Sequence, residues 1–328
     1  MKPVRIAVVG AGAIGGWLAA RLALAGEQVS VLARGATLDR IRTEGILLHS
    51  GGRSERARVP AASDASQLGE QAIVLITVKA PALPGLAPSL QSMLGPDTLV
   101  LYAGNGLPWW YFLPPGQPCE GQRLASVDPQ RAIEGAIPLA QVLGLSVFSS
   151  CHCPQPGVVH HSAGGRLSLG EPAGGLSQRV QHLVQRLQAA GLDAHASDDI
   201  RRDIWLKLLG NACFNPVSLL TGAATDDMID QPALHALFSR MMEEAIAIGG
   251  RLGLRLDVEP QRRIAQSRAL GHIKTSMLQD LEAGRAVELD AILGALVEAA
   301  AAVAMPALDL STVLAMARLR ARHAELPT

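Results

Sequence analysis

The chain has 328 residues, which is enough for one large domain or two ordinary ones with well-buried cores. Hydrophobic residues make up 48% and charged residues 18%, so the composition excludes a disordered chain. Lysine plus arginine and aspartate plus glutamate both total 29, and this balance leaves no global field for nucleic acid or an anionic membrane. Four cysteines form no disulfide framework, and the longest uncharged stretch is broken by prolines and glycines. We therefore expect a cytoplasmic protein without a membrane span. Binding of a small anionic ligand by a few charged side chains is compatible with this balance.

The first predicted elements form a βαβ unit around a glycine loop. A buried strand over 4–9 leads directly into Gly10-Ala11-Gly12-Ala13-Ile14-Gly15, a helical pattern follows, and a second strand covers 28–33. A Gly-x-Gly-x-x-Gly run between a strand and a helix lets backbone amides approach a pyrophosphate at the helix N-terminus. In this context the loop predicts a dinucleotide site, and the alternative is a glycine-rich turn without a ligand.

The end of the second strand indicates which dinucleotide is bound. An NAD site usually places an acidic residue there for the ribose hydroxyls, but this chain has Arg34 and no acid. A guanidinium suits a 2′-phosphate, so the sequence predicts NADP(H) over NAD(H). The alternative interpretation is a solvated surface arginine.

Polar residues follow the ends of the next strands. A hairpin is predicted near 45–60, then a strand over 72–78 ending at Lys79, and a strand over 98–102 followed by Asn105. Ligands bind at the carboxyl edge of an open parallel sheet, so these side chains are expected beside the glycine loop. For Lys79 the alternative is an ordinary exposed lysine at a strand end.

Residues 144–170 read as extended strands. Within them, Cys151-His152-Cys153 with His160 and His161 resembles a zinc ligand set, but the spacing lacks the usual pair of metal knuckles. Packing within the strands is the favoured interpretation, and no metal is predicted. A helix from Leu176 to Leu187 and a short strand over 193–196 complete a predicted first domain of residues 1–197.

Residues 198–328 are predicted to form an all-helical second domain. The expected helices after the first one cover 232–252, 258–270, 275–283, 287–304 and 307–323. The first helix carries Lys207, Asn211 and Asn215 at intervals of four, which places all three on one face. Buried polar groups need partners, and either a polar substrate or an interdomain hydrogen-bond ladder satisfies that requirement.

These motifs together resemble the ketopantoate reductase family, the 2-dehydropantoate 2-reductases, over nearly the whole chain. The matching segments are the Gly10–Gly15 loop, Thr77-Val-Lys79-Ala, Asn105-Gly106, Trp205-Leu-Lys207 with Asn211 and Asn215-Pro216, and Ser276-Met-Leu-Gln-Asp280 with Glu288-Leu-Asp290. The resemblance implies an α/β fold with an N-terminal Rossmann-type NADPH-binding domain, an all-α C-terminal domain, and an active site in the cleft. It implies NADPH-dependent reduction of 2-dehydropantoate to pantoate in pantothenate and coenzyme A biosynthesis.

The resemblance also implies roles for single residues. Lys207 matches the family's catalytic lysine, a general acid toward the alkoxide that hydride addition forms, and Glu288 matches a glutamate beside the cofactor and that lysine. The expected substrate-binding residues are Asn105, Asn211, Asn215 and Ser276. The expected cofactor-binding residues are Gly10, Ala11, Gly12, Ala13, Ile14, Gly15, Arg34, Lys79, Asn105, His152 and Glu288, with His152 acting through its backbone.

Two departures from the family pattern leave the substrate open. The aromatic run Trp109-Trp110-Tyr111-Phe112 follows Asn105-Gly106, and Thr225 stands where the family has a substrate-contacting asparagine. The aromatic run either reshapes the pocket for a bulkier 2-keto or 2-hydroxy acid or packs at a domain or dimer interface. A non-catalytic NADP-binding sensor is the alternative of a different class. The expected partner is a small 2-keto acid, without nucleic acid or membrane, and a homodimer stays open.

Overall fold

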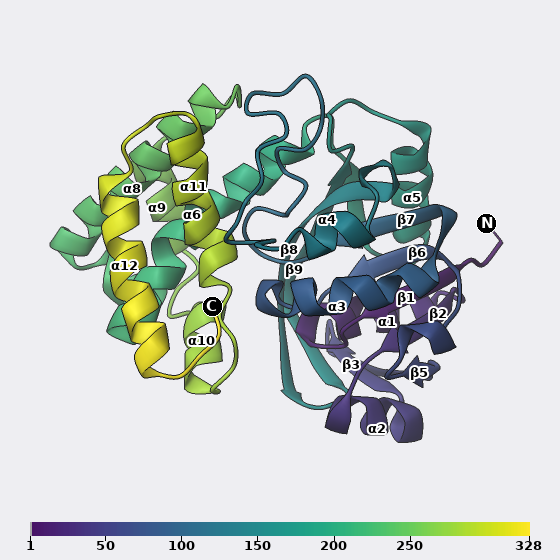
Figure 1. The fold of residues 1–328 in the computed structure, drawn as a ribbon. Coiled ribbons are helices and arrows are strands. Elements are labelled where there is room, and N and C mark those ends of the chain that lie inside the picture. The colour runs from purple at the N-terminus through teal and green to yellow at the C-terminus, as the bar shows by residue number, and fades with distance from the viewer. Residues whose placement is uncertain (1) are drawn as a thin grey trace. The chain divides into compact units, whose positions relative to one another are not determined.

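The computed structural model describes residues 2–328 and divides them into two units (Figure 1). Among the described residues, the first unit comprises 2–78, 85–104 and 132–200, and the second comprises 79–84, 105–131 and 201–328. Two segments from the first part of the chain therefore belong to the helical unit. The predicted boundary after residue 197 stays a prediction, and the contacts place both Lys79 and Asn105 in the second unit.

The first unit is built on a mixed sheet of ten strands (Figure 1). Its strands are β1 (Arg5–Val9), β2 (Gln28–Leu32), β3 (Ile46–Ser50), β4 (Arg53–Ala57), β5 (Ala61–Ala62), β6 (Gln71–Ile76), β7 (Leu94–Tyr102), β8 (Val142–Gln155), β9 (Val158–Gly170) and β10 (Asp193–Ala196). Their order is β4-β3-β9-β8-β7-β6-β1-β2-β5, and β10 pairs with β9. Strands β7, β6, β1, β2 and β5 run parallel, which is the arrangement a dinucleotide-binding half requires.

The buried strands explain why this sheet forms. Ile6 to Val9 are fully buried, so β1 is apolar on both faces as a central parallel strand must be. The helix α1 (Ala13–Leu24) packs Trp17, Leu18 and Leu22 into the same core. The predicted hairpin near 45–60 is confirmed by antiparallel β3 and β4, which are joined by Gly51 and Gly52.

Three further helices belong to the first unit: α2 (Gly35–Glu44), α4 (Ala132–Ala136) and α5 (Gln178–Ala189). The short helix α3 (Leu83–Leu90) begins in a segment of the second unit and ends in the first. In α5 the Ser177 hydroxyl caps the first turn by accepting a bond from the Val180 amide, and one apolar face holds Val180, Leu183 and Leu187. The opposite face is polar, so the apolar residues recur at helical spacing, and this periodicity predicts the helix from the sequence.

Within its described residues, the second unit contains helices and loops and no β-strand (Figure 1). Its helices are α6 (Ile200–Thr221), α7 (Thr225–Ile229), α8 (Pro232–Arg251), α9 (Pro260–Arg268), α10 (Ser276–Glu282), a π-helical turn at Asp290–Gly294, α11 (Ala295–Ala302) and α12 (Leu308–His323). α8 contacts α7, α9, α11 and α12, so it is the central helix of this unit. Helix α6 continues through Pro216, which lies five residues before its end.

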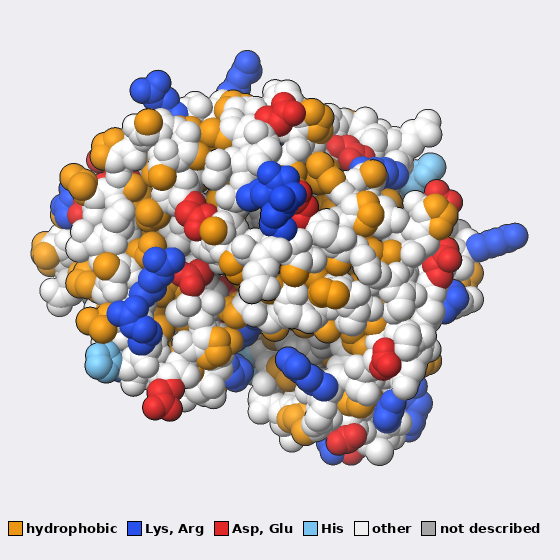
Figure 2. All heavy atoms as spheres, in the orientation of Figure 1, with side chains coloured by type: hydrophobic (Ala, Val, Ile, Leu, Met, Phe, Trp, Pro, Cys, Tyr) orange, Lys and Arg blue, Asp and Glu red, His pale blue; other side chains and the backbone are white. Residues whose placement is uncertain are grey.

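None of the helices among residues 2–328 combines the length and the apolar character needed to cross a bilayer. On the face drawn in Figure 2, basic and acidic side chains are interspersed. This mixture agrees with the balanced composition, and it gives that face no single-sign field.

Candidate active site

A buried carboxylate joins three segments of the second unit. Glu288 is only 9% exposed. It lies just before the first turn of the helix that follows it in the chain. Its Oε2 accepts a 2.7 Å hydrogen bond from Asn105 Nδ2, and its Oε1 accepts longer bonds from the Asn105 and Ala80 amides. Asn211 Nδ2 in turn donates to Asn105 Oδ1 at 3.3 Å. The structure thus brings together three residues that the sequence predicted separately.

The backbone after Asn105 is fixed by the π-helical turn. The Leu107 amide donates a 2.9 Å bond to the carbonyl of Ala291, inside the turn Asp290–Gly294. Gly106 has φ +86°, and a Cβ there would lie 2.0 Å from that carbonyl oxygen, so only glycine fits. π-helical turns occur often at functional sites, and this one carries a contact that the sequence did not predict.

Lys207 lies on α6 one helical turn before Asn211. Burial lowers the pKa of its amine to about 8, and the negative charge of Glu288 acts in the opposite direction. A lysine with an ordinary pKa is a poor proton donor at neutral pH, whereas a pKa near the working pH favours general acid catalysis. The Glu288 group therefore supplies a charged partner to a lysine whose surroundings suit proton transfer.

Lys79 has its partners within the second unit. Its amine is 2.6 Å from Asp280 Oδ1 and donates a 2.9 Å bond to the carbonyl of Ala286. Arg285 also contacts the Asp280 carboxylate at 3.0 Å. The sequence did not identify Asp280 as a partner, although it lies in the motif that carries the family resemblance. The predicted cofactor-binding role of Lys79 stays a prediction.

The other predicted substrate residues occupy the same unit. Asn215 is buried on α6, and Ser276 is exposed at the first position of α10. The Thr275 hydroxyl caps α10 through the Leu278 amide and contacts the Ser218 hydroxyl of α6. This cap fixes the start of α10 against α6. None of these contacts tests the substrate-binding roles, which stay predictions.

The aromatic run, which is the first departure from the family pattern, is packed inside the second unit of this chain. Trp109, Trp110, Tyr111 and Phe112 are all at most 3% exposed. The Tyr111 hydroxyl donates to the Arg201 carbonyl at 2.9 Å, and the Arg201 guanidinium lies over the Tyr111 ring. These contacts lie within the second unit, so the aromatic run packs there, and both the reshaped pocket and the interface stay predictions.

Thr225 is also engaged in packing. Its amide and its hydroxyl both donate to the Ile273 carbonyl, at 2.9 and 3.0 Å. The residue is 8% exposed, so its hydroxyl is committed to the loop before α10.

The glycine loop of the first unit fits a dinucleotide. Gly10 has φ +94°. Gly12 is the N-cap residue of α1, and the first turn of this helix receives no capping hydrogen bond from a side chain there. A Cβ on Gly15 would lie 1.9 Å from the Gly10 carbonyl oxygen, so the loop and helix approach as closely as the fingerprint requires. The first turn of α1 contains no acidic residue, which leaves its positive end available to phosphate oxygens.

Arg34 and His152 occupy the first unit as well. Arg34 is exposed directly after β2, at the carboxyl edge of the parallel strands, as the sequence predicted. His152 on β8 stacks on His160 of β9, whose ring also stacks on His49 of β3. Burial and the two neighbouring histidines lower the pKa of His160. Face-to-face rings have parallel rather than converging lone pairs, so packing explains this group.

The two units define a class of protein, with an α/β dinucleotide-binding unit and a helical unit that carries the half-buried Lys207, Asn105 and Asn211 with the buried Glu288. Family models agree with this class. Residues 6–174 match the model "Ketopantoate reductase PanE/ApbA", and residues 199–321 match "Ketopantoate reductase PanE/ApbA C terminal". The chain therefore belongs to the ketopantoate reductase family, which confirms the resemblance seen in the sequence and the prediction of an oxidoreductase.

Individual relatives extend this result. The 2-dehydropantoate 2-reductase of Mesorhizobium japonicum is 43% identical over 96% of this chain and 97% of its own length. The crystal structure of a Ralstonia solanacearum protein assigned to the ketopantoate reductases matches with a TM-score of 0.95 at 45% identity, covering 99% of this chain and all of that one. The 2-dehydropantoate 2-reductase of Methylococcus capsulatus matches with a TM-score of 0.81 at 28% identity, covering 98% of this chain and 97% of that one. These matches confirm the predicted fold class.

The close approach at Gly15 yields a test of the loop. We expect Gly15→Ala to lower the melting temperature strongly, because the added methyl group meets the Gly10 carbonyl and the Thr77 hydroxyl. Gly12→Ala is the matched control, since a Cβ there meets nothing within 4 Å. Thermal unfolding by circular dichroism measures both. Equal melting temperatures for the two variants would contradict the described packing.

The lowered pKa of Lys207 yields a pH prediction. A protonated amine is needed to donate a proton, so kcat/KM for a 2-keto acid is expected to fall above about pH 8, tenfold per pH unit. Glu288→Gln removes the charge that raises this pKa, so its descent is expected to begin at a lower pH than in the wild type. Steady-state rates across pH measure both limbs. A wild-type profile that stays flat to pH 10 would exclude Lys207 as the titrating acid.

Proposed function

We propose that this protein reduces 2-dehydropantoate to pantoate with NADPH, and that Lys207 is the general acid. The observation that carries the proposal is a lysine of lowered pKa that feels the charge of the buried Glu288 carboxylate, which also binds Asn105. The relative with 43% identity that bears the name of this activity supports the choice of substrate.

NADPH supplies a hydride to the ketone carbon when it is bound. The residues of this chain do the rest: the ammonium of Lys207 donates a proton to the ketone oxygen as negative charge develops there. Glu288 holds Asn105 through two bonds and keeps a negative charge near the lysine, so that the amine binds its next proton readily. Asn211 and Asn105 are bonded to each other and present amide groups suited to hydroxyl and carboxylate oxygens.

The cofactor assignment is supported by the loop and by the charge that follows β2. The loop from Gly10 to Gly15 is shaped for a pyrophosphate, and Arg34 is an exposed cation at the position where an NAD site has an acid. A guanidinium makes charge-assisted bonds to a 2′-phosphate that the ribose hydroxyl of NAD lacks. We therefore propose NADPH as the preferred reductant.

The proposal for a bulkier substrate has weaker support. It requires the aromatic run to line the pocket, whereas the four side chains are buried and the Tyr111 hydroxyl is bonded to the Arg201 carbonyl within the second unit. A cytoplasmic location and a homodimer also stay predictions of the sequence.

The proposed reaction is tested by the loss of the lysine. We expect Lys207→Ala to reduce kcat for 2-dehydropantoate by about 10²- to 10⁴-fold, the usual contribution of a general acid. Lys207→Arg is expected to be similarly impaired, because a guanidinium keeps the charge but does not release a proton. NADPH absorbance is followed over a panel of 2-keto acids, with Lys2→Ala as the control lysine.

Three outcomes of that panel distinguish the alternatives. Turnover of 2-dehydropantoate that is lost with Lys207 supports the proposal. Turnover of a larger keto acid alone identifies a different substrate. NADPH binding without turnover of any member of the panel contradicts the proposed activity and favours a sensor.

The cofactor preference is tested at Arg34. We expect Arg34→Ala to raise KM for NADPH by about 10- to 100-fold while KM for NADH is unchanged, because only the phosphate loses a charged partner. Arg53→Ala, at the exposed first residue of β4, is the matched control. Parallel loss of affinity for both dinucleotides would show that Arg34 does not read the 2′-phosphate.

A further inference from the structure

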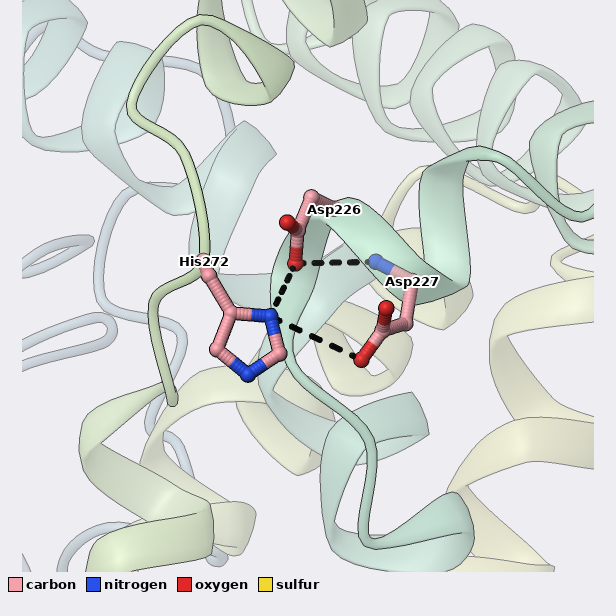
Figure 3. A group of neighbouring side chains, drawn as sticks. All are labelled: Asp226, Asp227 and His272. Carbon is pink, nitrogen blue, oxygen red and sulfur yellow. Dashed lines mark hydrogen bonds and ion pairs between the residues drawn. The ribbon is translucent and has the colours of Figure 1, made fainter.

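Three metal-ligating side chains converge in the second unit, apart from the Glu288 group (Figure 3). Asp226 and Asp227 lie in the first turn of α7, and His272 lies in the loop between α9 and α10. Nδ1 of His272 is 3.1 Å from Asp226 Oδ1 and 3.7 Å from Asp227 Oδ2. Among residues 2–328, this is the one group of at least three histidine, cysteine or acidic side chains whose ligand atoms all lie within 4.8 Å of one another.

We propose that Asp226, Asp227 and His272 bind one divalent transition-metal ion, with zinc as the best fit. Zinc bonds to imidazole nitrogen and carboxylate oxygen are about 2.0–2.2 Å long, so ligand atoms that share an ion lie roughly 3 to 4 Å apart. The measured separations from Nδ1 fall in this range. One imidazole and two carboxylates favour zinc over magnesium or calcium, which prefer oxygen ligands alone.

The charges around the site favour a cation. The neighbouring Arg268 is committed to Asp230, with bonds of 2.7 and 2.8 Å to its two carboxylate oxygens. Lys274, two residues after His272, pairs with Glu282. His272 is the basic side chain in direct contact with both aspartates, while the charge of Arg268 acts on them from farther away. A divalent ion between the two carboxylates would neutralise both of them.

The backbone holds the ligands in place from two sides. Thr225, directly before the aspartates, donates twice to the carbonyl of Ile273, directly after the histidine. These two hydrogen bonds fix α7 and the loop to each other independently of any ion. A preformed site of this kind loses little conformational entropy when an ion binds.

The exposure of the site allows a metal to enter. The Asp226 side chain is 15% exposed, whereas His272 and Asp227 are 69% and 60% exposed, so water reaches the open side and completes the coordination. The bound ion ties the loop to α7. This proposal does not depend on the reaction proposed above.

The test uses the full-length protein, freed of metal by chelator and dialysis, and isothermal titration with zinc chloride. We expect one saturable site in the wild type and a rise in melting temperature with zinc. His272→Ala and Asp227→Asn are expected to weaken binding at least tenfold and to remove the thermal shift. Both side chains are exposed, so these variants are expected to fold, and circular dichroism checks this. His235→Ala is the matched control, since that histidine contacts Gln261 elsewhere in the unit.

Three outcomes would overturn the proposal. Absence of saturable zinc binding would make the group a surface ion pair. Equal affinity in the wild type and His272→Ala would place the ion elsewhere. Loss of binding on Cys151→Ser or His152→Ala, with His272→Ala unaffected, would assign the ion to β8.

Discussion

The fold of the second unit depends on one buried carboxylate that must be satisfied. A carboxylate that is largely removed from water is costly unless it accepts hydrogen bonds or faces a positive charge. Glu288 meets this requirement with the Ala80 amide, the Asn105 amide and side chain, and the charge of Lys207. These partners come from the segments 79–84, 105–131 and 201–328. Glu288 therefore links these segments and the candidate catalytic groups through one set of interactions.

The same arrangement sets stability against function. Burial holds the pKa of Lys207 near 8, below its ordinary value of 10.5, so the unfolded chain binds more protons between these two pH values. The free energy of unfolding therefore rises with pH across that window, and the protonated lysine destabilises the fold at neutral pH. The chain retains this lysine although an apolar residue of similar volume would suit a buried position better. Such a trade is common where a group must transfer a proton.

Local chemistry made much of the fold predictable, and long-range contacts did not. The βαβ unit, the 45–60 hairpin and the Lys207–Asn211 face follow from turn residues and from helical or strand periodicity, which neighbouring residues decide. The bond between Asn105 and Glu288 joins residues 183 apart, and the resemblance named both without giving their contact. The π-helical turn at Asp290–Gly294 has no sequence signal, and the pairing of Lys79 with Asp280 depends on tertiary packing. Composition alone could not decide whether the aromatic run packs in the protein interior or lines the substrate pocket.

The central claim is that the proton affinity of the Lys207 amine is set by desolvation and by the charge of Glu288. Carbon-detected NMR of the lysine side chains measures this directly, because the chain has only four lysines and Lys207→Arg assigns the signal. The account predicts that the Lys207 resonance titrates near pH 8 in the wild type and lower in Glu288→Gln. A midpoint near the ordinary value for lysine, unchanged by Glu288→Gln, would contradict it.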